Sequence, residues 1–282
     1  MERKPNTEYI LSLSYGKDSI ACLEAIRLLG WPLDRIVHAE VWATDTIPAD
    51  LPPMVEFKVK ADAIIKERYG IEVEHFRAKH TYEDRFYIVK KTGRGPGDYR
   101  GFPMVRRPWC NSDLKRPALR MACGKNSVQY VGIAADEPER LERLEKHNKV
   151  SPLAAIGWDE AYCRKWCEEN DLLSPIYTSA TRGGCWFCHN QGVDQLRILR
   201  RSYPEYWSML LKWDKDSPII FKPDGHTVHD YDARFAAEDA GLAPADRTFR
   251  WEMIGRKIIK PRVELPGQMT MEDFVHANFG GL

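Results

Sequence analysis

The sequence lacks a long apolar run and an excess of either charge. No stretch approaches the roughly 20 apolar residues that a membrane-crossing helix needs, and no apolar signal segment follows the polar residues 1–8. We therefore expect a cytoplasmic protein with no membrane partner. The formal net charge of +1 favours neither nucleic acid nor small acidic ligands for the chain as a whole, so local clusters must carry such predictions.

The sequence also lacks internal repeats and low-complexity tracts. A chain of 282 residues can form one large domain, or one domain of about 180 residues with an appendage. Its seven cysteines are an odd number. We expect free thiols in a reducing compartment, where clustered cysteines indicate metal or redox chemistry more than disulfides.

Short apolar runs alternate with helical patterns in the first part of the chain. Residues 9–13 suit a buried strand, and apolar residues recur at helical spacing over 20–28. The pattern then continues with strands expected at 35–42, 71–76 and 129–134 and a helix at 53–70. We predict an α/β fold with a Rossmann-like, doubly wound and mostly parallel sheet over residues 1–190. Residues 191–282 are expected to form a helical C-terminal appendage.

The turn between the first strand and the first helix is rich in small polar residues. Ser14, Gly16, Lys17, Asp18 and Ser19 stand at the helix N-terminus, where backbone N–H groups lack partners and the helix dipole is positive. Such a loop can wrap a phosphate. The serines and the backbone would donate hydrogen bonds, Lys17 would add positive charge, and Asp18 could hold Mg²⁺. The alternative is an ordinary capped helix after a strand.

Two later segments are expected at the same edge of the sheet. Asp45 follows the second strand, whereas Asp136, Glu137 and Arg140 follow the fourth. Ligands of an open parallel sheet bind beyond the carboxyl ends of its strands, so these residues are candidates to face the same ligand. The last three can equally form the cap and first turn of the next helix. The sequence leaves open whether any of the carboxylates is a base or only positions magnesium.

A long irregular segment, residues 80–107, is glycine-rich and basic. Its basic residues include Arg94, Arg100, Arg106 and Arg107, and among them stand the aromatic residues Tyr87, Tyr99 and Phe102, with Trp109 just beyond. Cationic and aromatic side chains in one loop can engage a nucleotide or an RNA strand. A solvated surface loop is the alternative.

Cys185 and Cys188 give the strongest metal signal. A Cys-x-x-Cys turn behind two glycines can point two thiolates at one ion or cluster. If a single helix separates Cys110 from Cys123, they lie about 20 Å apart and cannot join the same site. Cys110 precedes that helix, on the side where the preceding loop approaches the expected ligand site at the carboxyl ends of the strands. We therefore choose Cys110 as the third ligand.

These three thiolates suit a [4Fe–4S] cluster with one iron open to a non-protein ligand. The alternative is a Zn²⁺ site completed by His189 or water. Cys163 and Cys167 are four residues apart on an expected helix and would share one face. We expect them to pack as small apolar residues.

Residues 14–19 resemble the Ser-Gly-Gly-Lys-Asp-Ser signature of the adenine nucleotide alpha hydrolases, the PP-loop ATP pyrophosphatase superfamily, with Tyr15 at the first glycine. Over residues 8–190 the chain resembles the phosphoadenosine phosphosulfate (PAPS) reductase family. The order of motifs is similar, namely Thr44-Asp45-Thr46, Cys110 ahead of Leu114-Lys115, residues 132–140, Pro152-Leu153, Trp158-Asp159-Glu160, Ser174-Pro175-Ile176-Tyr177 and Gly184-Cys185-Trp186-Phe187-Cys188.

The resemblance implies a Rossmann-like sheet that binds ATP with Mg²⁺, or a sulfonucleotide, on the loop. With the candidates above, the expected catalytic residues are Lys17, Asp18 and Asp45. The expected nucleotide-binding residues are Ser12, Ser14, Tyr15, Gly16, Lys17, Asp18, Ser19, Thr44, Asp45, Gly132, Asp136, Glu137 and Arg140.

Two features depart from a true sulfonucleotide reductase. Those enzymes attack sulfur with a cysteine near the C-terminus, whereas no cysteine follows Cys188 here, and the cluster-bearing members have tandem cysteines where this chain has Trp109-Cys110. We therefore expect an adenylating, pyrophosphate-releasing sulfurtransferase with a nucleic-acid acceptor and a sulfur donor. The alternatives are a reductase that uses an external thiol or thiol reductant protein, and a non-catalytic nucleotide-binding protein with structural zinc. The oligomeric state, including a homo-oligomer, stays open.

Overall fold

The computed structural model describes residues 1–92, 95–104, 108–124, 126–144, 148–178 and 183–256. The chain divides into two compact units, Met1–Ile219 and Ile220–Leu282. The domain boundary expected between residues 190 and 191 stays a prediction. None of the helices in the described ranges combines the length and the apolar character that a membrane span requires.

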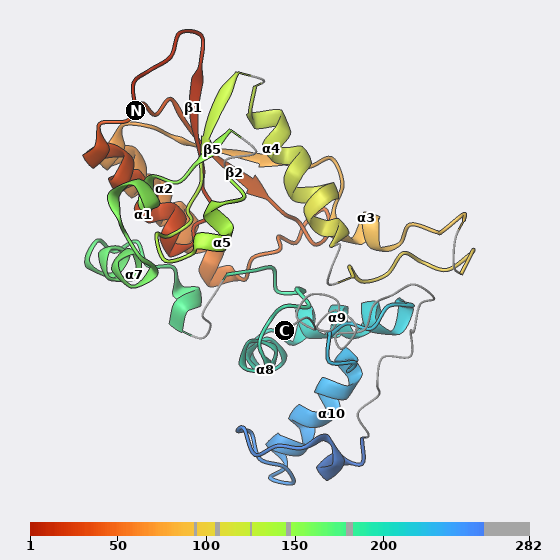
Figure 1. The fold of residues 1–282 in the computed structure, drawn as a ribbon. Coiled ribbons are helices and arrows are strands. Elements are labelled where there is room, and N and C mark those ends of the chain that lie inside the picture. Colours follow the sequence, from red (N-terminus) through yellow and green to blue (C-terminus); the bar gives the residue numbers. More distant parts are fainter. Residues whose placement is uncertain (93–94, 105–107, 125, 145–147, 179–182, 257–282) are drawn as a thin grey trace, which may run out of the picture. The chain divides into compact units, whose positions relative to one another are not determined.

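A five-stranded parallel sheet forms the centre of the first unit (Figure 1). Its strands are β1 (Glu8–Ser12), β2 (Arg35–Glu40), β3 (Val73–Arg77), β4 (Ser127–Tyr130) and β5 (Lys149–Val150). The strand order is β3-β2-β1-β4-β5, which confirms the predicted α/β, doubly wound architecture. β2 and β3 follow one another on one side of β1, and β4 and β5 then add to the sheet on the other side of β1. The switch point between β1 and β4 is where such sheets bind ligands.

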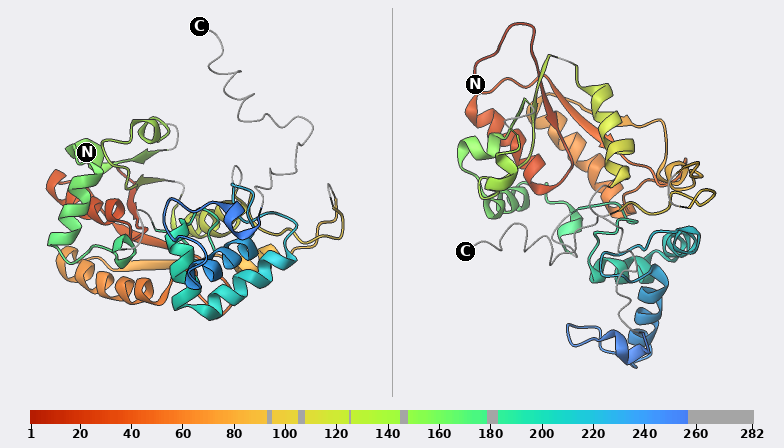
Figure 2. Two further views of the ribbon diagram at one scale, coloured as in Figure 1. Left: turned by 90° about the horizontal axis from the view of Figure 1, so that it is seen from below. Right: turned by 45° about the vertical axis from the view of Figure 1, so that its right-hand side comes forward.

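Helices cover both faces of this sheet, which explains why residues 9–13 read as a continuous apolar run. Tyr9 and Leu11 point to one face and pack in a core with residues of α1 (Lys17–Leu29), α2 (Pro52–Tyr69) and α7 (Glu160–Glu169). Ile10 points to the other face and packs against residues of α4 (Arg116–Ala122). Figure 2 shows α1 and α7 side by side, and α6 (Pro152–Ile156) also packs on α1.

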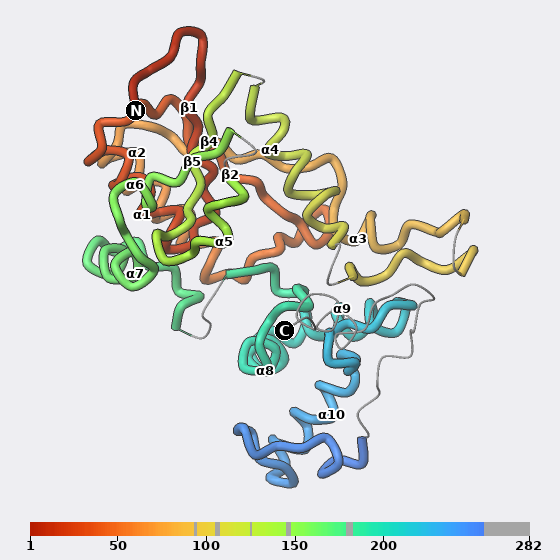
Figure 3. The backbone as a smooth tube through the Cα atoms, viewed as in Figure 1, coloured from red at the N-terminus to blue at the C-terminus, as the bar shows by residue number. Residues whose placement is uncertain are grey.

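The rest of the first unit is built from short elements and two longer helices. These are α3 (Tyr82–Phe86), the π-helical turn η1 (Asn111–Lys115), α5 (Pro138–Leu141), the 3-10 turn η3 (Pro175–Thr178), α8 (Val193–Ser202) and α9 (Pro204–Asp216). After α3 the chain forms two extended segments of opposite direction, which an antiparallel bridge between Val89 and Tyr99 joins (Figure 3). An aromatic cluster, defined here as Tyr82, Phe86, Trp109, Phe187 and Trp213, connects α3 with α9.

The second unit contains α10 (Val228–Asp239) and the 3-10 turn η4 (Trp251–Ile254). Thr227 caps α10 through a capping box with Asp230. Trp251 stacks on His226 with 3.7 Å between ring centroids. The helical character expected beyond residue 190 is confirmed by α8, α9 and α10, of which the first two belong to the first unit.

Candidate functional site

The predicted phosphate loop joins β1 to α1 at the switch point. Gly16 is the N-cap of α1 and, having no side chain, makes no capping hydrogen bond of its own. Ser19 Oγ lies 3.0 Å from Ser14 Oγ and accepts a hydrogen bond of 3.1 Å from the backbone N–H of Ser14. The backbone N–H of Lys17 donates to the Tyr177 hydroxyl at 3.1 Å. The serines therefore close the loop on itself, and the N-terminus of α1, with the Asp18 carboxylate in its first turn, lies beside this loop. A helix N-terminus in such a place suits an anion or a cation-bridged phosphate.

Tyr15 holds the loop in a backbone conformation that favours glycine. Its φ angle is 56°, in the left-handed region where a side chain is strained. The ring is fully buried, and the hydroxyl donates to the Asp62 carboxylate of α2 and lies 3.3 Å from His75 Nε2 of β3. Burial and the Asp62 hydrogen bond raise the pKa of Tyr15. Anchoring on α2 and β3 thus replaces the freedom that a glycine would supply.

Gly132 follows β4 and touches the backbone of the loop. A Cβ atom there would lie 2.5 Å from the backbone nitrogen of Ser19, and 2.7 Å from Ser19 Cα and from the carbonyl carbon of Asp18. These are backbone atoms at the start of a helix, so they cannot rotate away as a side chain can. The close packing of strand end and helix start therefore requires glycine at position 132.

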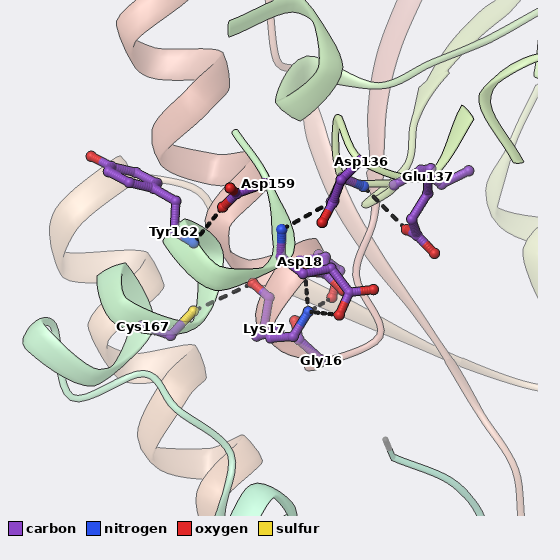
Figure 4. Close-up of polar contacts among 12 residues, drawn as sticks. Gly16, Lys17, Asp18, Asp136, Glu137, Asp159, Tyr162 and Cys167 are labelled. Atoms are coloured by element: carbon purple, nitrogen blue, oxygen red, sulfur yellow. Dashed lines mark hydrogen bonds and ion pairs between the residues drawn. The ribbon is translucent and has the colours of Figure 1, made fainter. Parts of the chain in front are cut away.

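Lys17 is held by two carboxylates (Figure 4). Its Nζ donates to Asp18 at 2.7 Å and to Glu160 of α7 at 2.9 Å, and only 8% of its side chain is exposed. Burial disfavours the charged form of Lys17, but the hydrogen bonds and charges of the two carboxylates outweigh it and raise the pKa of Lys17. Burial also raises the pKa of Asp18, against the influence of Lys17. A bound phosphate would compete with these carboxylates for the ammonium group.

Asp136 and Glu137 lie beside Lys17 and Asp18 in Figure 4, and their carboxylates accept hydrogen bonds from backbone N–H groups. Asp136 Oδ1 accepts from the backbone N–H of Glu160, and Glu137 Oε2 accepts from that of Ala134, each at 3.2 Å. Glu137 also pairs with Arg140. Glu137 is the N-cap residue of α5, but its side chain makes no capping hydrogen bond to that helix. The roles of both carboxylates toward a nucleotide stay predictions.

Thr44 and Asp45 lie beyond β2. The Thr44 hydroxyl accepts from the backbone N–H groups of Thr46 and Ile47. The Asp45 side chain is 92% exposed and meets Arg77 at 3.4 Å. Neither is among the described residues that line the cavity at the switch point. The catalytic role of Asp45 stays a prediction.

This cavity has a volume of about 430 Å³, within the usual range for small-ligand sites. The predicted nucleotide-binding residues in its lining are Ser12, Ser14, Tyr15, Gly16, Asp18, Ser19, Gly132 and Arg140. Two further cations, Lys58 and Lys115, line it as well, and so does Cys185. The phosphate loop and one of the predicted metal-binding thiols therefore face a single cavity.

Sequence reasoning missed the side of the cavity formed by α2. Lys58 Nζ donates to His38 Nε2 at 2.8 Å and to Asp50 at 2.5 Å. His38 Nδ1 lies 2.8 Å from the Leu13 carbonyl oxygen, so we assign the ring proton to Nδ1. Burial and the Lys58 charge lower the pKa of His38 to about 3, which keeps it neutral. An ammonium has three N–H groups, so Lys58 retains one for a ligand. No local motif marks a lone lysine on a helix.

The Cys-x-x-Cys turn is fixed by backbone contacts. Cys188 N–H donates to the Cys185 carbonyl at 3.0 Å, and Trp186 donates from its backbone to Ala49 and from its indole to Pro48, at 2.9 and 3.0 Å. Trp186 is fully buried. The core therefore holds the turn against the segment that follows β2, and Cys185 takes its place in the cavity lining.

The three predicted ligand thiols influence one another electrostatically. Burial raises the pKa of Cys185 to about 12, opposed by Lys115 and reinforced by Cys188 and Cys110. Burial, and then Cys188, raise the pKa of Cys110, which is the N-cap of η1. In the described part of the chain, no three His, Cys, Asp or Glu side chains are arranged as a metal site. By their chemistry, three cysteine thiols are the donor set that an iron–sulfur cluster or zinc takes, and the metal role of these three stays a prediction.

The other cysteines have structural surroundings. Cys163 and Cys167 are fully buried on α7, as expected, and Cys167 Sγ donates to the Lys17 carbonyl at 3.3 Å. Cys123 is the C-cap of α4. These thiols therefore belong to the packing behind the loop and at the end of a helix.

The basic segment is only partly described. Arg94, Arg106 and Arg107 lie outside the described residues. Arg100 donates to Asp113 at 2.7 Å. The expectation that Phe102 and Trp109 meet a nucleotide or RNA is wrong, because they are 1% and 7% exposed and pack against Phe86 and Tyr82, respectively.

No family model and no curated protein matches the chain. Among solved structures, the chain is similar to the U34-tRNA thiolase NcsA from Methanococcus maripaludis with its [4Fe-4S] cluster, with 16% identity, a TM-score of 0.36, and coverage of 75% of this chain and 73% of that chain.

Proposed function

We propose that the chain is an ATP-dependent sulfur-transfer enzyme that adenylates an oxygen of its acceptor, releases pyrophosphate and replaces that oxygen with sulfur. The observation that supports the proposal is the cavity into which both the phosphate loop and Cys185 face. ATP activates an oxygen of the acceptor, and sulfur then attacks the carbon that carries this oxygen, so the two kinds of group have to share one space. The resemblance of residues 14–19 to the PP-loop ATP pyrophosphatase signature supports the pyrophosphate-releasing step.

In the first step the acceptor oxygen attacks the α-phosphorus of ATP, the bond from that phosphorus to the bridging oxygen breaks, and Mg²⁺-pyrophosphate leaves. Backbone donors of the loop, with Ser14 and Ser19, hold the phosphates. Lys17 neutralises charge that develops on them, and Asp18 is the candidate for holding Mg²⁺. Thr44, Asp45, Asp136, Glu137 and Arg140 complete the proposed nucleotide site.

In the second step a sulfur nucleophile displaces AMP from the activated carbon. Cys110, Cys185 and Cys188 would hold the metal group, for which we propose a [4Fe–4S] cluster. Bound through three thiolates, it would leave one iron for an external sulfur ligand. Cys185 would keep this group at the cavity, and Lys58 and Lys115 would attract an anionic sulfur species to the lining.

We further propose nucleic acid as the acceptor. The glycine-rich, basic segment over residues 80–107 supports this class, because cationic loops bind the phosphate backbone. A sulfur donor is a necessary partner, since no thiol of the chain is consumed in the scheme.

The test is an anaerobic assay for AMP, pyrophosphate and sulfur incorporation. Protein reconstituted with iron and sulfide is incubated with Mg·ATP, sulfide and, in separate reactions, total tRNA or genomic DNA. We expect AMP and pyrophosphate in equal amounts, with labelled sulfur in one of the two nucleic acids. Cys185→Ser should abolish sulfur incorporation, whereas Cys123→Ser, which changes a thiol outside the cavity lining, should retain it.

Two results would contradict the proposal. The first is ATP that stays intact with both nucleic acids. The second is sulfite release from adenylylsulfate or its 3′-phosphorylated form with an external thiol, which would identify a reductase instead.

A further inference from the structure

Tyr82, the first residue of α3, carries a buried hydroxyl that lacks an explanation within the protein. The side chain is 1% exposed, and its oxygen has no hydrogen-bond partner among the residues that the structure describes. Buried hydroxyl groups in native proteins nearly always have a partner, because leaving one unpaired is unfavourable. The unpaired phenol is thus a hydrogen-bond donor available to a ligand beside it.

The ring of Tyr82 is packed between the two segments that carry the predicted ligand thiols. Its centroid lies 4.1 Å from that of Phe187 and 4.9 Å from that of Trp109. Phe187 directly precedes Cys188, and Trp109 directly precedes Cys110. Aromatic packing thus places the phenol where these two cysteine segments meet.

Charge on the thiols also acts on Tyr82. Burial raises the pKa of Tyr82 well above its usual value, and negative charge on Cys110, Cys188 and Cys185 adds to the shift, in that order. The phenol therefore stays protonated and available as a donor. All three predicted ligands act on it, although they come from two separate segments of the chain.

We propose that the Tyr82 hydroxyl donates a hydrogen bond to a sulfur atom of an iron–sulfur cluster held by Cys110, Cys185 and Cys188. This inference rests on the metal site of the proposed function and makes Tyr82 a positioning residue for the cluster. Sulfur is the acceptor we propose because Cys110 and Cys188 directly follow the two aromatic residues, Trp109 and Phe187, that pack on the ring. Binding of the cluster gives the hydroxyl its partner.

The hydrogen bond has a measurable electrostatic consequence. A reduced cluster carries one more negative charge than an oxidised one, so a donor to its sulfur atoms stabilises the reduced form and raises the reduction potential. Without the cluster, the same hydroxyl has no partner, and its removal leaves the rest of the packing intact. Tyr82→Phe should therefore affect the loaded protein and leave the metal-free protein at least as stable.

The experiment compares Tyr82→Phe with wild type and with Tyr87→Phe. Tyr87 is a matched control from the same segment, because its hydroxyl donates to Asp216 at 2.7 Å and so has a partner within the protein. Each protein is reconstituted without oxygen. Iron and sulfide content, the midpoint potential from an EPR-monitored titration, and the Tm before and after loading are then measured.

We expect Tyr82→Phe to bind as much iron as wild type, to have a lower midpoint potential, and to gain less in Tm on loading. Its metal-free Tm should equal or exceed that of wild type. Tyr87→Phe should keep the wild-type potential and have a lower metal-free Tm.

Equal potentials and equal gains in Tm for Tyr82→Phe and wild type would overturn the inference, and so would a wild-type chain that binds no iron. None of these measurements uses turnover. A lowered potential together with absent pyrophosphate release would therefore overturn the proposed function while supporting the role of Tyr82.

Discussion

Replacing Gly132 by alanine adds one methyl group where the end of β4 meets the phosphate loop. The added Cβ would lie 2.5 Å from the backbone nitrogen of Ser19, whereas ordinary contact begins at 3.4 Å. The start of α1 or the end of β4 must therefore shift by about 0.9 Å. The atoms in contact belong to the backbone at the start of α1, and Ser19 is 5% exposed, so rotation of a side chain cannot relieve the contact.

The shift falls on the groups that are proposed to bind phosphate. A misplacement of about 1 Å in a catalytic site can reduce rates about 100-fold, and overpacking typically destabilises a protein by about 1–3 kcal/mol. We expect Gly132→Ala to bind Mg·ATP at least tenfold more weakly and to unfold at a lower denaturant concentration. Gly124→Ala is the matched control, because Gly124 precedes the same strand and a Cβ there meets nothing within 4 Å.

Calorimetric titration with Mg·ATP and chemical denaturation of the two variants test this reasoning. A Gly132→Ala protein with the ATP affinity and stability of wild type would refute it. Equal losses in Gly124→Ala would also refute it, since they would show that any side chain near β4 has the same effect.

Three further predictions concern the groups around the loop. Tyr15→Phe keeps the buried ring but loses the hydrogen bond to the Asp62 carboxylate, so denaturation should show a loss of about 2 kcal/mol; an unchanged free energy of unfolding would count against the anchor. Hydrogen bonds with Asp62 and then Glu40 raise the pKa of His75 from its ordinary value of 6.5 to about 9. The protonated His75 should therefore stabilise the fold fully below pH 6.5, and this stabilisation should vanish as the pH rises through about 9. The Tm difference between wild type and His75→Gln should shrink over that interval, and a difference that grows would contradict the assignment. Glu160→Gln removes one competitor for the Lys17 ammonium and should tighten ATP binding by about 0.2–1 kcal/mol, as for a half-exposed pair; weaker binding in a titration would contradict this competition.

The sheet and the loop could be predicted because their signals are local. A continuous apolar run over residues 9–13 followed by helical spacing requires a strand buried on both faces and then a helix. The polar residues between them can only form the turn at the strand's carboxyl end. The Cys-x-x-Cys spacing of Cys185 and Cys188 is a local signal as well, because it lies within four adjacent residues, and the metal role that it suggests stays a prediction.

Groups brought together from distant parts of the chain could not be predicted in this way. Tyr15 breaks the glycine signature, and only its contacts with α2 and β3 explain how the left-handed backbone is held. Lys58 lines the cavity because α2 crosses beside β2, which no local pattern encodes. Trp109 stands next to basic residues in the sequence and suggested stacking on a nucleotide. Its burial beside Tyr82 depends on the tertiary packing of α3.

The central claim is that the phosphate loop and the three-cysteine site belong to one active site. The measurement that tests it most directly is the EPR spectrum of the reduced, cluster-loaded protein during titration with Mg·ATP. The account predicts a spectral change that saturates at the dissociation constant found by calorimetry and that moves to higher ATP concentration in Gly132→Ala. A spectrum unchanged by saturating ATP, or a chain that binds ATP but no iron, would contradict it.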